Sequence, residues 1–427
     1  MLLQFKVKNF RSFKDEAVLS LEAQRTDDRH PDNFVRAGKD MCLKTLAIFG
    51  ANAAGKSNLM LALTAAIMTV RMSNTLNAGQ ELLFVTPFKF DDETAAQPTC
   101  FETVFIAEKK KYVYRFAATR ARIISEALYV YNSAKGSLIF ERSEKGYRYT
   151  SKKIRTQLEP VERLTGENKL FLSTASAFNC DAVKAPYSWF ANGVNTVAPN
   201  DPNTQNMALA MLENDADSSL HSFANKLLHW ADVNIDDFEF HSQEVDREKF
   251  LQGVPPQIRG LIGANLGDHH KQYELNSIHR FGDKNAPREY KLPFTQESAG
   301  TTKLFFFSSV LKHALENGET ICVDELDTSF HPLLISQLVG LFNNPNVNTN
   351  GAQLIFSAHT AELLSLDEFR RDQICFVSKD AQTGASSLKS LDEYSPRLNE
   401  NVRRAYLLGR YGAVPDIAQD FVLWGRS

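Results

Sequence analysis

Alternating apolar and polar residues near the start of the chain predict an antiparallel sheet. Over residues 2–8, Leu3, Phe5 and Val7 alternate with polar side chains, which is the period of a strand with one buried face. Residues 17–23 have the composition of a hairpin partner. Between residues 99 and 132, three β-branched or aromatic runs separated by charged turns predict a β meander, and shorter strands should continue to about residue 151.

The remaining pattern mixes strands with helices. An apolar run over 44–49 leads into the sequence GANAAGKS, and residues 57–72 carry apolar side chains at helical spacing. From 155 to 235 the pattern is mainly helical, and it becomes strand-like from 236 to 295. Beyond 297 the order is helix, strand, helix, strand, followed by a last strand, QICFVSKD. We therefore predict an α/β protein with three parts: 1–150, a mainly helical or mixed insertion over 151–290, and 291–427.

Composition narrows the class of protein. The 427 residues are 43% hydrophobic and 23% charged, which is typical of a globular chain and excludes a disordered or collagenous one. The net charge of −3 gives no overall positive field, so a nucleic-acid ligand would need a local basic patch. Five scattered cysteines without a CxxC pair argue against a disulfide framework or a structural zinc site. The start of the chain does not resemble a signal peptide, and no apolar run reaches about 18 residues. We expect a cytoplasmic protein with no membrane segment.

The sequence from Gly50 to Ser57 matches the phosphate-binding pattern G-x4-G-K-S in full. Glycines allow the backbone to curl so that its N–H groups point at a phosphate, and the helix that follows presents its positive end to the same anion. In this pattern Lys56 reaches the β- and γ-phosphates, and the Ser57 hydroxyl binds Mg²⁺. We count Asn52 and Asn58 among the expected nucleotide contacts. A chance glycine-rich turn is the alternative, but the preceding strand and the following helix supply the context that the pattern requires.

An apolar strand over 320–323 ends in two carboxylates, Asp324 and Glu325. One carboxylate on the metal and one beside the attacking water is the division expected for phosphoryl transfer, so Asp324 is a candidate for Mg²⁺ and Glu325 for the catalytic base. His359 follows the next apolar strand, 35 residues after Asp324. It could contact the γ-phosphate or the water, and an ordinary core histidine is the alternative.

A second helix start with anion-binding features precedes the acidic strand. Ser298 can cap a helix, and Gly300 would let a phosphate approach the helix N-terminus. One γ-phosphate does not need two such helix ends from one subunit. The simplest use is in trans, with Ser298 and Gly300 closing over the nucleotide of another subunit. An ordinary serine-capped helix is the alternative.

The order of these motifs resembles that of ABC-class ATPase heads. The sequence NFRSF over 9–13 is similar to the start of the RecF, SMC and Rad50 branch. More narrowly, ESAGTTKLF, DELDTSFHP and AYLLGRYGAVPDI resemble a bacterial family of ATPases linked to abortive infection, whose members include the AbiL, RloA and AriA proteins. The resemblance covers roughly 1–150 and 290–427.

The resemblance implies a fold, a ligand and partners. The fold would be an ABC-type P-loop ATPase head, a mixed sheet with flanking helices, joined to an antiparallel β subdomain and an inserted helical subdomain. ATP and Mg²⁺ would bind between two heads of a homodimer or a higher homo-oligomer. The role would be antiphage defence, with a phage protein as trigger and a separate nuclease or toxin as effector. The family motifs fall on Gly50, Gly55, Lys56 and Ser57 (phosphate loop), Ser298 and Gly300 (signature), Asp324 and Glu325 (acidic motif) and His359 (switch histidine).

Two positions depart from the SMC-type pattern. Such heads place Leu-Asp about four residues after the acidic pair, where this chain has Phe330, His331 and Pro332. Asp327 or His331 could take the place of the dimer-crossing aspartate. The glutamine that usually senses Mg²⁺ is also not obvious, and Gln80 is the candidate.

Several alternatives stay open. The lysine run 109–111 and the nearby arginines could contact DNA, although a solvated hairpin tip explains them at least as well. Arg403, Arg404 and Arg410 could approach a nucleotide or a partner. Two rival functions remain: a DNA-binding repair ATPase of the RecF type, and a scaffold held by ATP whose turnover is negligible.

Overall fold

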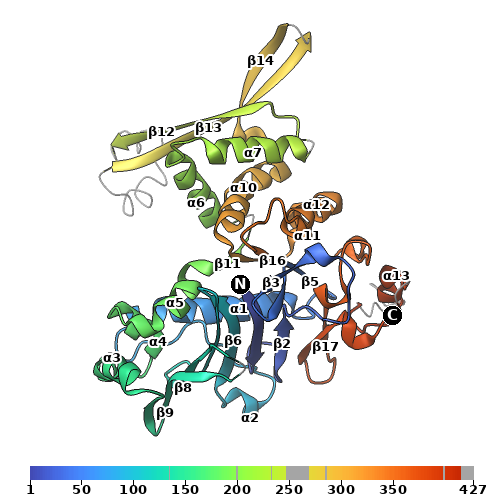
Figure 1. Cartoon of the computed structure of the whole chain (residues 1–427). Coiled ribbons are helices and arrows are strands. Elements are labelled where there is room, and N and C mark those ends of the chain that lie inside the picture. The colour runs from blue at the N-terminus through green and yellow to red at the C-terminus, as the bar shows by residue number, and fades with distance from the viewer. Residues whose placement is uncertain are drawn as a thin grey trace, which may run out of the picture. The chain divides into compact units, whose positions relative to one another are not determined.

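The computed structural model describes residues 1–133, 135–198, 201–231, 233–246, 269–283, 286–397 and 400–414. The chain forms two compact units (Figure 1). The first comprises Met1–Val197 and Ala314–Ser427, and the second comprises Ala198–His313. The first boundary follows a strand that ends at Val197, and the second falls inside a helix between His313 and Ala314, so the second unit is an insertion in the first.

An antiparallel sheet of seven strands builds one layer of the first unit. Residues Leu3, Phe5 and Val7 are fully buried, as the alternation predicted. The meander predicted over 99–132 is confirmed, since each strand there pairs antiparallel with the next. In sheet order the strands are β10 (Gly146–Tyr149), β9 (Ser137–Ser143), β8 (Ile123–Tyr131), β7 (Lys110–Ala118), β6 (Thr99–Ala107), β1 (Leu2–Lys8) and β2 (Ala17–Ser20).

A second sheet, of six strands, is mostly parallel. Its order is β11 (Val194–Val197), β15 (Thr320–Val323), β16 (Gln353–Ser357), β5 (Thr45–Phe49), β17 (Ile374–Lys379) and β18 (Ser386–Ser390). Only β18 runs antiparallel to its neighbour. The carboxyl ends of β15, β16, β5 and β17 therefore meet at one edge of the sheet, where ligands bind in open α/β folds. A two-stranded ribbon of β3 (Phe34–Ala37) and β4 (Asp40–Leu43) completes the strands of this unit.

Helix α1 (Lys56–Met72) is buried around most of its circumference. Leu59, Leu63 and Ile67 form one broad buried face together with the smaller Ala62 and Ala66, and Leu61 and Met72 are exposed on the opposite side. A helix with so wide an apolar face packs against the core on more than one side. A single cluster of buried side chains joins α1 to residues of both sheets, including Phe5 and Val7 of β1 and Leu46 and Ile48 of β5. The phosphate-loop helix is thereby fixed between two layers.

The helices that follow the antiparallel sheet also belong to the first unit. They are α3 (Lys152–Glu162), α4 (Phe171–Ala177) and α5 (Asp181–Ser188), followed by a π turn over Trp189–Gly193. Phe171 and Phe190 are fully buried, and the ring of Trp189 stacks on Phe105 with centroids 4.2 Å apart. The insertion expected over 151–290 thus differs in its bounds from the compact unit over 198–313, because these helices complete the core of the first unit. Helix α12 (Pro332–Asn343) and the short helices α2 (Asp92–Ala95), α11 (Leu326–Ser329) and α13 (Val402–Leu407) lie in the same unit.

The second unit combines helices with a three-stranded antiparallel sheet. Phe305 packs against Phe238 and Phe294, with ring centroids 4.7 and 4.5 Å apart, and forms the centre of its core. The elements are α6 (Pro202–Glu213), α7 (Ser219–Trp230), β12 (Asp237–Asp246), β13 (His269–Asp283), β14 (Ala286–Pro293) and α10 (Ala299–Asn317), the last of which crosses the unit boundary.

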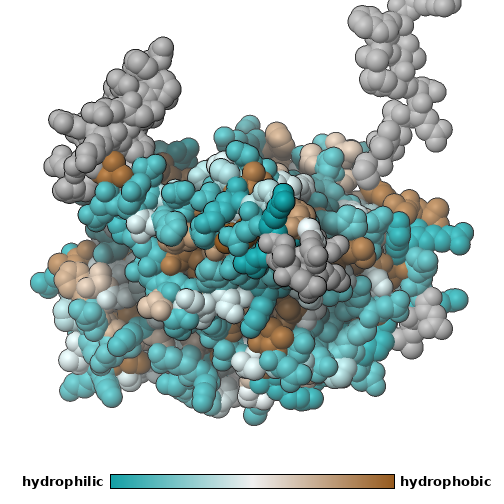
Figure 2. Space-filling view, turned by 90° about the horizontal axis from the view of Figure 1, so that it is seen from above, coloured by the Kyte–Doolittle hydropathy of each residue, from teal (hydrophilic) through white to brown (hydrophobic). Residues whose placement is uncertain are grey.

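Figure 2 shows a face covered largely by hydrophilic residues, on which hydrophobic ones form small, separate groups. All five cysteines are free. Burial raises the pKa of Cys42 and of Cys375 to about 12, so these two thiols stay protonated and unreactive. Among the described residues, no helix combines the length and the apolar character needed to cross a membrane.

Candidate functional site

The phosphate loop begins where β5 ends, and two of its glycines are required by close packing. A Cβ at Gly50 would lie 2.4 Å from the carbonyl oxygen of Val377, on the neighbouring strand β17. Gly55 has φ of +119°, and a Cβ there would lie 2.4 Å from Ser386 Oγ. Both contacts are far shorter than van der Waals distance, so no other residue fits without moving the loop. The glycine pattern therefore reflects the way the loop is wedged against β17 and β18.

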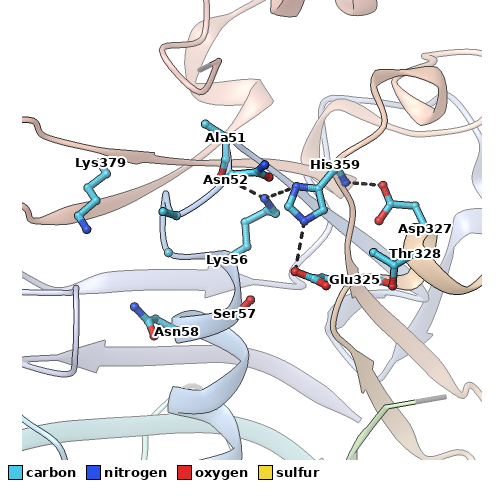
Figure 3. A pocket seen from close by; sticks show the side chains of 12 residues that line it. Ala51, Asn52, Lys56, Ser57, Asn58, Glu325, Asp327, Thr328, His359 and Lys379 are labelled. Atoms are coloured by element: carbon cyan, nitrogen blue, oxygen red, sulfur yellow. Dashed lines mark hydrogen bonds and ion pairs between the residues drawn. The ribbon is translucent and has the colours of Figure 1, made fainter. Parts of the chain in front are cut away.

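Lys56 opens helix α1, and its side chain turns back over the loop (Figure 3). Its Nζ donates to the carbonyl oxygens of Gly50 at 2.7 Å and Ala51 at 3.2 Å, and lies 3.1 Å from Nδ1 of His359. The residue is only 4% exposed. Burial lowers the pKa of Lys56, while Asp327, Asp324 and Glu325 oppose that shift. A cation held by backbone oxygens at a helix N-terminus is suited to receive an anion.

These contacts fix the tautomer of His359. An ammonium group only donates, so the Nδ1 atom facing Lys56 must accept. The proton then sits on Nε2, which lies 3.3 Å from Oε1 of Glu325 and can donate to it. Lys56, His359 and Glu325 form a continuous hydrogen-bonded chain (Figure 3). The side chain of Glu325 is 46% exposed, so its carboxylate can meet water.

Ser357 links the two carboxylates that follow β15. Its hydroxyl donates to Oδ1 of Asp324 and accepts from the backbone N–H of Glu325 at 2.8 Å. Glu325 has φ of +51°, a left-handed conformation that a non-glycine residue adopts at a cost of about 1–3 kcal/mol. The turn directs Glu325 toward His359, while Asp324 faces Ser357. Neighbouring carboxylates in the sequence therefore have different surroundings.

A cavity of about 770 Å³ lies above the loop. Seven of the predicted site residues line it: Asn52, Gly55, Lys56, Ser57, Asn58, Glu325 and His359. Its wall also contains Asp327, Thr328 and Lys379 (Figure 3). Gly50 and Asp324 are not in the wall. Gly50 accepts a hydrogen bond from Lys56 behind it, and Asp324 accepts one from Ser357.

The two signature residues lie in the second unit, so their position relative to this cavity is not defined. Ser298 Oγ accepts from the backbone N–H of Thr301 at 3.1 Å, which is the contact of an N-cap at the start of α10. A Cβ on Gly300 would meet nothing closer than 3.9 Å. Packing within the unit therefore does not require this glycine.

The other candidates lie outside the cavity wall. Gln80 accepts from the backbone N–H of Asn77, and Nδ1 of His331 accepts from the N–H of Leu333 at the start of α12. Lys111 pairs with Glu22 and Asp40, and Arg410 with Glu400. Residues 415–417 of the late motif lie outside the described residues.

Sequence reasoning missed the residues that support the loop from behind. Ser12 of the NFRSF turn accepts a hydrogen bond from Asn58 Nδ2 at 2.8 Å, and its Oγ lies 2.8 Å from Ser386 Oγ. The Ser386 hydroxyl donates to the carbonyl oxygen of Ala54 at 2.6 Å, because that oxygen can only accept. No local pattern marks these residues, because they come from three distant segments. Lys379 could have been found, since it ends a strand whose carboxyl end belongs to the same sheet edge as the loop.

The residues present fit a nucleotide and a magnesium ion. The loop offers a buried lysine and the start of a long helix to phosphates. Within the described ranges, no group of three or more histidine, cysteine or acidic residues could hold a metal by itself. Mg²⁺ commonly binds through one or two protein ligands together with substrate phosphates and water. A serine hydroxyl and a carboxylate such as those of Ser57 and Asp324 are oxygen donors of that kind; Ser57 lines the cavity, whereas Asp324 lies outside its wall and contacts Ser357.

Comparison with known protein families gives one match. Residues 46–365 match the family model described as "AAA domain, putative AbiEii toxin, Type IV TA system". No curated protein matches the sequence.

Among solved structures, the SMC head domain from Thermotoga maritima aligns at 14% identity and a TM-score of 0.40, covering 91% of this chain and 98% of that one. An Smc head domain bound to the C-terminal domain of ScpA, from Pyrococcus furiosus, aligns at 12% identity and a TM-score of 0.40, covering 92% and 97%. CbiO1 from Clostridium perfringens, part of the ABC transporter complex cbiONQ, aligns at 11% identity and a TM-score of 0.30, covering 96% and 98%.

The family match spans 320 of 427 residues, from the strand before the phosphate loop to the segment after His359. It includes every residue of the cavity wall except Lys379. The chain belongs to this AAA family of Abi-type P-loop ATPase domains.

Proposed function

We propose that this protein binds Mg·ATP in the cavity above the phosphate loop and hydrolyses it. The observation that carries the proposal is the chain of contacts from Lys56 through His359 to Glu325. Lys56, the proposed phosphate-binding cation, and Glu325, the proposed base, contact opposite nitrogens of this one histidine. A pocket that only held a nucleotide would not need an exposed carboxylate at that position.

Each residue has a distinct role in the proposed reaction. Lys56 and the amides at the start of α1 bind the β- and γ-phosphates. Glu325 accepts a proton from the attacking water, and His359 contacts the γ-phosphate or that water. When bound, Mg²⁺ supplies charge neutralisation at the phosphate oxygens, and Ser57 and Asp324 would hold it.

The cavity also suggests which way the nucleotide lies. Glu325, Asp327, Thr328 and His359 are at one end, and Lys379 and Asn58 are on the other side of the loop (Figure 3). With the γ-phosphate at the Glu325 end, the nucleoside would leave toward Lys379. We therefore assign Lys379 and Asn58 to the nucleoside side of the pocket.

ATP would be enclosed between two copies of the chain. Ser298 and Gly300 of one subunit would close over the nucleotide of the other, in a homodimer or a higher homo-oligomer. The open space around Gly300 supports this role, because a glycine that its own unit does not require is available to a ligand.

The biological role that we propose is antiphage defence in the cytoplasm. The family description names a toxin and a toxin–antitoxin system, which supports a protein that controls a toxic activity. The ATPase would sense infection, with a phage protein as trigger, and would regulate a separate nuclease or toxin. Direct DNA binding belongs to the rival repair function, and the pairing of Lys111 with acidic neighbours does not favour it.

The test compares the wild-type protein with Lys56→Ala in the full-length chain. Removing a buried cation that makes charge-assisted contacts should weaken ATP binding by at least roughly tenfold. The Lys56→Ala variant should also lose ATP turnover. In cells that carry the neighbouring genes, it should no longer protect against phage. The matched control is Lys109→Ala, an exposed lysine at a turn between β6 and β7. Unchanged ATP affinity in Lys56→Ala would refute the assignment of the loop.

The same preparation separates the rivals. Hydrolysis that rises strongly with added DNA, with salt-sensitive DNA binding, would favour the repair ATPase. Wild-type turnover as slow as that of a variant without the base would favour the scaffold.

A further inference from the structure

Asp327, in the short helix α11, lines the cavity and has no role in the proposed reaction. One carboxylate oxygen, Oδ2, accepts hydrogen bonds from the backbone N–H groups of His359 at 2.6 Å and Thr360 at 2.7 Å. Both distances are at the short end of the range for N–H···O bonds, as expected for an ionised acceptor. Asp327 thus ties the segment after β15 to the segment after β16.

The second carboxylate oxygen of Asp327 is unusual. Oδ1 is buried and has no hydrogen-bond partner among the described residues. Leaving a buried acceptor unpaired costs about 1–3 kcal/mol. Such groups in native structures call for an explanation, and a role in function is one of those known. The aspartate is therefore not explained by stability alone.

We propose that Asp327 is a positioning residue of the ATPase site, which fixes His359 between Lys56 and Glu325 by holding its backbone. The inference deepens the proposed function and rests on it. His359 follows the last residue of β16 by two positions, so the strand does not set its backbone. With the two N–H groups held by one oxygen, the imidazole can face Lys56 and Glu325 at once. A residue already engaged in this way serves its own subunit, which argues against Asp327 as the dimer-crossing aspartate.

Two substitutions at Asp327 distinguish its hold on the backbone of His359 from the effect of its negative charge. In Asp327→Asn, the side-chain oxygen can still accept both N–H groups, while the negative charge is lost. Asp327→Ala removes both. The control is Asp367→Ala, an exposed aspartate eight residues after His359.

Positioning predicts a split between binding and turnover. In Asp327→Ala, kcat should fall roughly 10–100-fold with KM for ATP changed less than about threefold, because a misplaced catalytic group costs rate rather than ground-state binding. Asp327→Asn should recover kcat to within about threefold of the wild type. The double variant Asp327→Ala with His359→Ala should be no slower than His359→Ala alone, since the aspartate acts through the histidine.

Two kinetic results would overturn the proposal: equal loss of kcat in the asparagine and alanine variants, which would make the charge decisive, or additive losses in the double variant. The NMR signal of His359 gives a second measurement, which does not depend on turnover and can be made even if the wild type does not hydrolyse ATP. In protein labelled with ¹³C-histidine, the imidazole signal that disappears in His359→Ala should shift in Asp327→Ala and return in Asp327→Asn. An unmoved His359 signal in the alanine variant would refute positioning whatever the rate of hydrolysis.

Discussion

At the scale of single residues, the site depends on donors and acceptors that have no freedom to exchange roles. Lys56 can only donate, so His359 accepts at Nδ1 and carries its proton at Nε2, beside Glu325. Glu325 reaches this place through a left-handed backbone conformation. The carboxylate next to it, Asp324, instead faces the hydroxyl of Ser357. The two adjacent acids therefore have different hydrogen-bond partners.

Glu325→Gln tests the base at this scale. Glutamine keeps the size and a hydrogen-bond acceptor for His359 but cannot take a proton from water. ATP affinity should stay within about threefold of the wild type, and turnover should fall by roughly 10²–10⁴-fold. Equilibrium binding of ATP and single-turnover hydrolysis measure the two quantities. Near-normal turnover would remove Glu325 from the role of base.

At the scale of elements, a buried carboxylate joins the antiparallel sheet to helix α4. Glu126 of β8 accepts from the backbone N–H groups of Phe171 at 2.6 Å and Leu172 at 2.8 Å, and from the hydroxyl of Tyr114 at 2.8 Å. It thereby satisfies amides at the start of α4 that have no partner within the helix. The sequence shows Glu126 only as a charged residue within a strand, and so it gives no sign that helices 152–188 pack with this sheet.

Glu126→Ala should lower the stability of the first unit by about 2–5 kcal/mol, because it leaves a cavity and three buried donors without their acceptor. Burial raises the pKa of Glu126 above that of an unfolded carboxyl, despite its donors. The folded state therefore favours the protonated form. The contribution that this pKa difference makes to the free energy of unfolding is fully present below the pKa that Glu126 has in the unfolded chain. It is lost as pH rises through the higher pKa that Glu126 has in the folded chain.

Urea unfolding at a series of pH values measures the effect of this substitution. Tyr114→Phe, which removes one of the three hydrogen bonds, serves as the milder control. An alanine variant as stable as the wild type at every pH would show that Glu126 does not join the sheet to α4.

At the scale of the whole molecule, the motifs are divided between two compact units. The phosphate loop, the acidic strand and His359 belong to the first, whereas Ser298 and Gly300 belong to the second. Because α10 carries the signature residues at its start and enters the first unit at its end, it connects the two. If a second copy closes over the nucleotide, as proposed, the second unit of one copy would contact the first unit of the other.

Ser298→Arg tests the use of the signature in trans. A bulky cation at the start of α10 should leave ATP binding by a single subunit within about threefold and abolish ATP-dependent association. Sedimentation with ATP, in a Glu325→Gln background that slows hydrolysis, measures association. Ser298→Ala is the control, since it removes the cap on Thr301 without adding bulk. ATP-dependent dimers of normal stability in the arginine variant would contradict the in-trans arrangement.

The sequence by itself determined the elements and the identity of the phosphate loop. Alternation over 2–8, the meander over 99–132 and the strand–loop–helix at 44–72 depend on neighbours in the chain, which local pattern encodes. The spacing of Gly50, Gly55, Lys56 and Ser57 likewise follows from one short segment. Predictions of this kind need no knowledge of distant contacts.

Tertiary structure alone decided what surrounds the loop and where the insertion begins. Ser12, Ser357 and Ser386 meet the predicted residues because the turn after β1, the end of β16 and the start of β18 come together at the loop, and no spacing in the sequence records that meeting. In the same way, helices 152–188 belong with the first unit because their apolar side chains complete its core. Contacts between residues far apart in the chain depend on packing, which a local pattern does not contain.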